Sequence, residues 1–352
     1  MKKAAIITIW DLWNLGNRLQ NYAVTSILSK KGLQPITVIE KNITEKKWLE
    51  FLKLQIYKII FLFSNGKNQR SMLFLRANSF KQFTKRHICF EHIHDSKELN
   101  KYDYIFIGSD QIWNAEIVCP NDFSYGQVTD KDKIICMAPS FGISAFEPSI
   151  EEIIKGYLNE IKYLNVREFT GANIIRRLAG KDVPVFVDPT LLISAEEWQI
   201  LERKPKRLGN RKYILKYFLG EESIESKSES EELYKLYGYE TITIMDKGNP
   251  WAFITGPAEF LYLIHHAEII LTDSFHACVF SILFKKPFWV YSRVGERMNS
   301  RLDTLFDILR IDNRFMHDMS NPFQVDYSKA DDRLVDERRR FNEFIEKAIY
   351  AG

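Results

Sequence analysis

The stretch EIILTDSFHACVFSILF, residues 268–284, contains two apolar runs joined by a polar turn. The first run is short enough for a buried strand, and the second is typical of a buried helix. Between them stand Asp273, Ser274, Phe275 and His276. Ser274 is a suitable helix N-cap, and the free N–H groups at a helix start attract anions. The turn therefore predicts either an anion site, in which His276 binds a ligand or moves a proton, or only a capped helix beside a packed histidine.

The same alternation of strand, turn and helix recurs along both halves of the chain. Strands are expected at 4–9, 34–41, 102–110, 132–142, 161–171, 183–193, 212–220, 240–247, 268–274 and 287–293. This order predicts an α/β protein with two Rossmann-like units, each built on a parallel sheet. A polar helix and a basic loop at 194–210 mark the expected boundary. Ligands of such units bind at the carboxyl ends of the strands, and a cleft between two units is the usual site.

Composition excludes several classes of function. The chain has 352 residues, a net charge of only +3 and four cysteines without a CxxC pair. These features favour two domains with reduced, cytoplasmic thiols and argue against a nucleic-acid binder. No run approaches the about 18 apolar residues of a membrane-spanning helix. Nucleotide-binding glycine loops and metal-ligand spacings are absent, so we expect no cofactor and assign no metal-ligating residues, and the sequence leaves the need for a metal open.

Other polar residues fall at the same strand ends. Arg167 follows an apolar run, and its guanidinium would suit a carboxylate or phosphate, or pair with Glu168. Trp113 stands beside polar side chains and could stack on a sugar or belong to the core. Arg293, Arg297 and Arg301 follow the last strand, and Arg301 fits a solvated helix face.

Several motifs resemble, in order, those of the polysaccharide pyruvyl transferase family. They are NLGNRLQNYAVTSILSKKG, YDYIFIGSDQIWN, APSFG, NVREFTG, VPVFVDPTLLI and AEIILTDSFHACVFSILFKKPF, within roughly residues 5–310. The resemblance implies a GT-B-like fold, with residues 1–193 on the acceptor side and 194–325 on the donor side. It also implies that the helix within 326–352 crosses back to the first unit.

The family resemblance also implies a reaction. Phosphoenolpyruvate would donate a pyruvyl group to a sugar of a bacterial surface polysaccharide precursor, which is often lipid-linked, and form a cyclic ketal. Arg167 and His276 match family residues associated with donor binding or catalysis. Many members have Arg-Leu-His where this chain has Ser274-Phe275-His276, and a lysine where it offers Arg293 or Arg297. Another base must therefore help to hold the donor.

The implied chemistry assigns roles to the strand-end residues. We expect Arg167, Ser274, Phe275, His276, Arg293 and Arg297 to bind the donor, and His276, Arg167, Asp273 and Asp110 to take part in catalysis. Asp188 is a further candidate, or only shapes an Asp-Pro turn. We expect the acceptor sugar to contact Asn14, Asn17, Gln111, Trp113 and Asn114. The alternatives are a GT-B glycosyltransferase that uses a nucleotide sugar and a non-catalytic scaffold of a polysaccharide assembly complex.

A basic segment lies outside these motifs. Residues 45–86 contain ten Lys or Arg against two Glu, and they predict two or three amphipathic helices. Its apolar residues Trp48, Leu49, Leu52, Ile56, Ile59, Ile60 and Phe63 recur at helical spacing. The helices could face the core with lysines on their solvent-exposed side, or bind peripherally to an anionic membrane surface.

Overall fold

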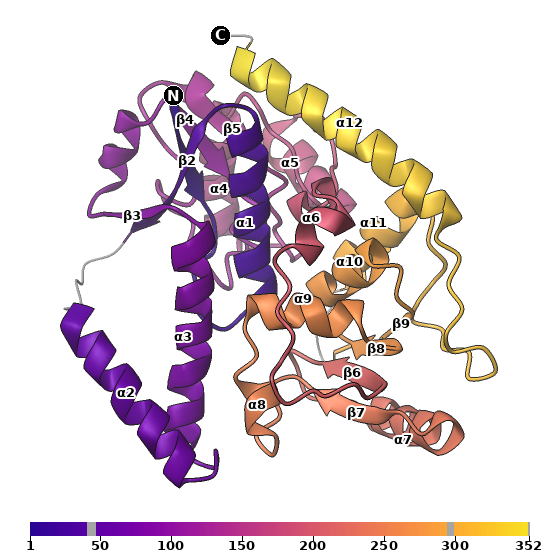
Figure 1. Cartoon of the computed structure of the whole chain (residues 1–352). Coiled ribbons are helices and arrows are strands. Elements are labelled where there is room, and N and C mark those ends of the chain that lie inside the picture. The colour runs from indigo at the N-terminus through magenta and orange to yellow at the C-terminus, as the bar shows by residue number, and fades with distance from the viewer. Residues whose placement is uncertain (41–46, 294–298, 351–352) are drawn as a thin grey trace.

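The structure, a computed structural model, describes residues 1–40, 47–293 and 299–350 and contains two parallel sheets (Figure 1). The first sheet has the order β3-β2-β1-β4-β5 and the second the order β7-β6-β8-β9. The strands are β1 (Lys3–Ile7), β2 (Gln34–Glu40), β3 (Phe90–Ile93), β4 (Tyr104–Ile107), β5 (Ile134–Cys136), β6 (Tyr213–Tyr217), β7 (Glu240–Thr243), β8 (Ile269–Thr272) and β9 (Phe288–Val290). Every strand pair within each sheet is parallel, as the alternation predicts.

Helices cover both sheets and fill the space between them (Figure 1). They are α1 (Leu15–Lys30), α2 (Lys47–Phe63), α3 (Gln69–His87), α4 (Pro148–Glu160), α5 (Phe169–Ala179), α6 (Ala195–Gln199), α7 (Ile224–Tyr237), α8 (Pro250–Phe253), α9 (Pro257–His265), α10 (Phe275–Leu283), α11 (Asn299–Leu309) and α12 (Ser328–Tyr350). Three short 3-10 turns, at Ser96–Lys101, Lys131–Lys133 and Pro189–Leu192, join some of these elements.

Two of the expected strands, 161–171 and 183–193, are wrong as ladder strands. In the described chain they form only single bridges, Ile135 with Tyr163 and Val166 with Val185. The side-chain amide of Asn165 takes the place of a strand backbone, since it accepts from the N–H of Ala138 and donates to the carbonyl of Cys136, both at 2.7 Å. Proline at 184 and 189 removes two ladder donors. The segments are nevertheless buried, which explains their strand-like pattern.

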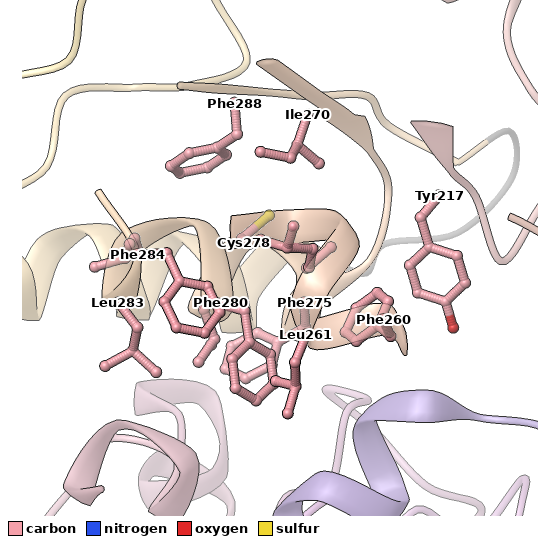
Figure 2. Packing of buried hydrophobic residues seen from close by; sticks show 14 of the residues in the cluster. Tyr217, Phe260, Leu261, Ile270, Phe275, Cys278, Phe280, Leu283, Phe284 and Phe288 are labelled. Carbon is pink, nitrogen blue, oxygen red and sulfur yellow. The ribbon is translucent and has the colours of Figure 1, made fainter. Parts of the chain in front are cut away.

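Helix α10 is buried on all sides, because it lies between the second sheet and the helices of the first unit. All nine of its residues are buried. Figure 2 shows Ile270 and Phe288 on one side of α10, and Phe280 and Leu283 on the opposite side. The same cluster includes Leu15 and Leu19 of α1, so one apolar core continues across both units. This packing fixes the start of α10 against the start of α1.

Helix α3 also joins the two units. Its Arg76 is fully buried and donates to the carbonyls of Phe253 and Thr255, both at 3.0 Å, and to that of Trp13 at 2.9 Å. Burial lowers the pKa of Arg76, so these three acceptors are what make the charge tolerable there.

Helix α12 lies across the molecule and reaches the first unit (Figure 1). Its Phe341, Ile345 and Ile349 pack in a cluster with residues of β1 and β4. The hydroxyl of Tyr104 donates to the carbonyl of Ile349 at 2.8 Å. The boundaries at 193 and 325 themselves stay a prediction.

Candidate functional site

Arg167 lies in a buried ion-pair cluster beside the end of β5. Its backbone N–H donates to the carbonyl of Pro139 at 3.1 Å, which fixes the start of the side chain. The guanidinium donates to Asp188 at 2.5 Å and to Asp110 at 3.4 Å. These three side chains are at most 6% exposed. Burial opposes the charge of Arg167, but the two carboxylates outweigh it and raise the pKa of Arg167.

The alternative pairing of Arg167 with Glu168 is not formed. One carboxylate oxygen of Glu168 accepts from the hydroxyl of Ser140 at 3.0 Å and from the N–H groups of Phe141 and Gly142 at 2.9 and 3.2 Å. Glu168 therefore holds the turn after β5, and its neighbour Arg167 is turned towards Asp188 instead.

Asp188 is held as an anion. One oxygen accepts from the N–H and the hydroxyl of Thr190, at 3.0 and 2.7 Å, and the other accepts from Arg167 and Ser109. Burial alone would raise the pKa of Asp188, but His276 and Arg167 lower it well below its ordinary value. Asp188 thus does more than shape a turn, and near neutral pH it has no proton to give.

His276 comes from the second unit and lies against the first. It is 5% exposed in the first turn of α10. A Cβ on Gly16, in the first turn of α1, would lie 2.0 Å from its Nδ1. Its Nε2 is 3.7 Å from Asp188, longer than a hydrogen bond, and has no hydrogen-bond partner among the described residues. A buried ring nitrogen without a partner is rare, and here it indicates a position for a ligand or a proton.

Arg301 is the second buried arginine at this contact, which corrects the solvated-face expectation. It is 6% exposed, and its guanidinium carbon is 5.8 Å from the Phe275 ring, while that of Arg167 is 4.4 Å from the same ring. In the described part of the chain no carboxylate lies within ion-pair distance of Arg301, and its buried Nε has no partner. Burial, followed by repulsion from Arg167, lowers the pKa of Arg301 to about 10, although Asp110 and Glu168 attract it from farther away.

Asp273 is already engaged in the structure. Its carboxylate accepts from the N–H groups of Leu219 and Gly220 at 2.7 and 2.8 Å, and from Nε of Arg293 at 2.7 Å. Asp273 therefore ties the end of β8 to the turn after β6. Ser274 occupies the N-cap position of α10, but its side chain makes no capping hydrogen bond. Arg297, expected at the donor, lies outside the described residues.

The expected stacking role of Trp113 does not agree with its environment. Trp113 is 1% exposed, and its ring stacks on Tyr125 at 5.2 Å and also packs on Phe141. Its indole N–H donates to the carbonyl of Ser124 at 3.3 Å. Because both the ring and the N–H have partners within the core, Trp113 presents no surface to a sugar.

The other expected acceptor residues make local contacts. The Asn14 side chain caps α1 through the N–H of Gly16 at 2.9 Å. The Asn17 amide donates to Asp11 at 2.5 Å, and Asn114 accepts from the N–H of Glu116 at 2.9 Å. Gln111 lies so close to Gly142 that a Cβ there would be 1.9 Å from its amide nitrogen. These contacts shape the loops around the site, and acceptor binding by these residues stays a prediction.

A model of one protein family matches most of the chain. The family is described as polysaccharide pyruvyl transferase, and the match covers residues 14–293. The chain belongs to the polysaccharide pyruvyl transferase family. The matched residues of this transferase family include Arg167 and His276, whereas Arg301 lies beyond them. No curated protein matches the chain.

One solved structure supports the GT-B-like fold. An enzyme described as a UDP-N-acetylglucosamine 2-epimerase from Listeria monocytogenes has a TM-score of 0.52 at 11% identity, and the match covers 100% of this chain and 97% of that one. A UDP-GlcNAc 2-epimerase from Methanocaldococcus jannaschii has a TM-score of 0.45 at 13% identity, with 95% and 99% covered. At 11% identity, the similarity to the Listeria monocytogenes structure is evidence for the fold alone.

Proposed function

We propose that this protein transfers the pyruvyl group of phosphoenolpyruvate to two hydroxyls of a sugar in a bacterial surface polysaccharide precursor. The products would be a cyclic ketal and phosphate. One observation carries the proposal beyond family membership. Two buried groups flank Phe275 at the contact between the two Rossmann-like units: the Arg301 guanidinium carbon is 5.8 Å from its ring, and the His276 ring is 5.4 Å from it. Among the described residues, Arg301 has no ion-pair partner and the Nε2 of His276 has no hydrogen-bond partner.

Phosphoenolpyruvate carries a carboxylate and a phosphate, and it needs a cationic partner that is not already neutralised. Arg167 forms ion pairs with two carboxylates, so its charge is largely neutralised by Asp188 and Asp110. Arg301 retains its charge and takes one anionic group of the donor. The first N–H groups of α10, at Phe275, His276 and Ala277, lack an intrahelical acceptor and can take the same or the other group.

His276 then moves the proton that the reaction requires. A proton must reach the methylene carbon, each of two sugar oxygens must form a bond to C2, and the C2–oxygen bond to phosphate must break. The two hydroxyl protons end on the new methyl group and on the phosphate. An imidazole can give and take protons near neutral pH. The carboxylate of Asp188 lies 3.7 Å from Nε2, the ring nitrogen that has no hydrogen-bond partner among the described residues and is therefore placed to exchange a proton with a ligand.

The burial of the site requires an opening step. Arg167, His276 and Arg301 are each at most 6% exposed, so a donor reaches them only after the surrounding chain has moved. Domain closure around a ligand is common in two-domain enzymes, and it excludes water from the reaction. Within this proposal, the structure corresponds to the closed arrangement.

Donor binding can be tested before the acceptor is known. Calorimetric titration of phosphoenolpyruvate should show saturable binding to the wild-type chain and at least about 30-fold weaker binding to Arg301→Met, since a charge-assisted contact is lost. A UDP-sugar should not compete. If UDP-sugars bind and phosphoenolpyruvate does not, the nucleotide-sugar glycosyltransferase replaces this proposal. If neither binds, the scaffold gains support.

Turnover is tested on the acceptor side. Mass spectrometry of lipid-linked saccharides from cells with and without the protein should show a pyruvyl group on one sugar only when the protein is present. Cells that carry His276→Gln should match cells without the protein. An unchanged saccharide pattern in all three strains would contradict the proposed reaction.

A further inference from the structure

Helix α2 exposes an apolar stripe. Leu52, Ile56, Ile59 and Phe63 follow one another at four, three and four positions, so they lie on one face of the helix. Their exposed fractions are 46%, 54%, 53% and 88%. The stripe is therefore not part of the core, contrary to the core-facing interpretation of this segment. Figure 1 shows α2 at the outer edge of the molecule, beyond α3.

The opposite face of α2 is already used. Tyr57 stacks on Phe74 of α3 with ring centroids 4.6 Å apart. At about 100° per residue, Tyr57 points away from the stripe, on the same side of the helix as Leu54 and Phe61, which are both partly buried. A helix that is apolar on every side is normally covered on every side. The packing on α3 leaves the stripe as the face that requires a partner.

The charge around the stripe indicates which partner. Residues 52–90 contain no Asp or Glu and eight Lys or Arg. Seven of these bases are exposed: Lys53, Lys58, Lys67, Arg70, Lys81, Lys85 and Arg86. By helical geometry Lys53 and Lys58 lie on opposite flanks of the stripe. An apolar stripe with bases on both flanks is typical of helices that lie in the interface of an anionic bilayer.

A second copy of the chain fits this surface less well. A two-fold contact would place the same patch against itself. Lys53 and Lys58 of one copy would then meet the same lysines of the other, and residues 52–90 offer no carboxylate to compensate them. Anionic headgroups neutralise these bases, while the acyl boundary takes the apolar side chains. Charge complementarity therefore favours lipid.

We infer that α2 docks on an anionic membrane surface with Leu52, Ile56, Ile59 and Phe63 in the acyl boundary and the flanking lysines at the headgroups. No helix in the described ranges is long and apolar enough to cross a bilayer, and docking of this kind does not need one. The inference does not depend on the reaction. It would place the enzyme where a lipid-linked sugar is found.

The test uses the full chain and vesicles of defined composition. At low salt the protein should co-sediment with vesicles that contain phosphatidylglycerol, and much less with pure phosphatidylcholine, and salt should release it. The double substitution Ile56→Asn, Ile59→Asn should weaken this binding at least about tenfold. Lys53→Gln, Lys58→Gln should weaken it by a similar factor, because each base near the surface contributes about 1 kcal/mol.

A matched control distinguishes the loss of this stripe from the loss of exposed apolar side chains elsewhere on the surface. Ile200 and Ile224 are 82% and 86% exposed and lie outside α2. The variant Ile200→Asn, Ile224→Asn should bind vesicles like the wild type. Circular dichroism and the affinity for phosphoenolpyruvate, measured on each variant, should stay unchanged, so a failure here is distinct from a failure of the proposed reaction.

Three outcomes would overturn the inference. One is the absence of vesicle binding, and another is equal binding to both vesicle types. The third is a concentration-dependent dimer in analytical ultracentrifugation that the Ile56→Asn, Ile59→Asn variant abolishes while its vesicle binding persists. That result would assign the stripe to a second copy of the chain.

Discussion

Replacing Arg301 with methionine should stabilise the ligand-free protein and weaken donor binding. The folded chain holds the Arg301 proton less tightly than the unfolded chain does, because burial and then repulsion from Arg167 lower the pKa of Arg301 to about 10, more than two pH units below the ordinary arginine value. At about 1.4 kcal/mol for each pH unit, the buried charge costs about 3 kcal/mol. This cost applies at every pH below about 10 and disappears as the pH rises from there towards the ordinary pKa of an arginine.

Methionine has a similar length and no charge, so Arg301→Met removes this cost while retaining most of the packing on Phe275. We expect a gain of about 1–3 kcal/mol in the free energy of unfolding at pH 7–9, measured by urea denaturation. Arg310→Met is the control, because Arg310 is 59% exposed in an ion pair with Asp307. It should change stability by less than about 0.5 kcal/mol.

The two effects of Arg301→Met should have opposite signs. A variant that is more stable but binds phosphoenolpyruvate at least about 30-fold more weakly identifies a residue kept for its ligand. A variant that loses stability and binds the donor normally would refute this reasoning. Arg301 would then have a structural partner, and the anion site would have to be sought elsewhere.

Three further predictions concern residues around this contact. Gly16→Ala should reduce turnover at least about tenfold because its Cβ would meet His276, whereas Gly156→Ala, with no atom within 4 Å of the new Cβ, should be neutral or stabilise the helix by up to about 1 kcal/mol. Arg167→Ala should lower the free energy of unfolding by about 3–5 kcal/mol, because two buried carboxylates lose their partner. His276→Gln, by contrast, should keep the fold and lower turnover about 30- to 1,000-fold. Trp113→Ala should cost about 3–5 kcal/mol in urea denaturation and leave the acceptor KM unchanged, and the reverse result would restore a sugar-binding role.

The fold was largely predictable because short apolar runs with polar turns have few other solutions. Residues 269–284 illustrate this, since β8 and α10 lie where the two runs predict them. The failures at 161–171 and 183–193 have one cause. A buried extended segment has the same apolar pattern whether its backbone pairs in a ladder or, as beside Asn165, bonds to a side chain.

The candidate site was only partly predictable. Arg167 and His276 stand at strand ends, which local patterns can identify. Arg301 lies within a helix of ordinary amphipathic composition, and its guanidinium carbon is 5.8 Å from the ring of Phe275, which belongs to a different element. Gly16 gave no signal at all, because its importance is a distance to His276. Such properties arise from packing between segments distant in sequence, and no local pattern encodes them.

The burial of Arg76 limits how the α2–α3 hairpin can vary. The hairpin is inserted between β2 and β3. Only its outer helix, α2, could be removed without loss of the contacts that join the two units. Deleting α3 would leave the carbonyls of Phe253, Thr255 and Trp13 without their donor and would open the core where Phe80 packs. A chain shortened within α2 keeps all of these contacts. Engineers can therefore exchange α2, with its exposed apolar stripe, without disturbing the junction that α3 closes.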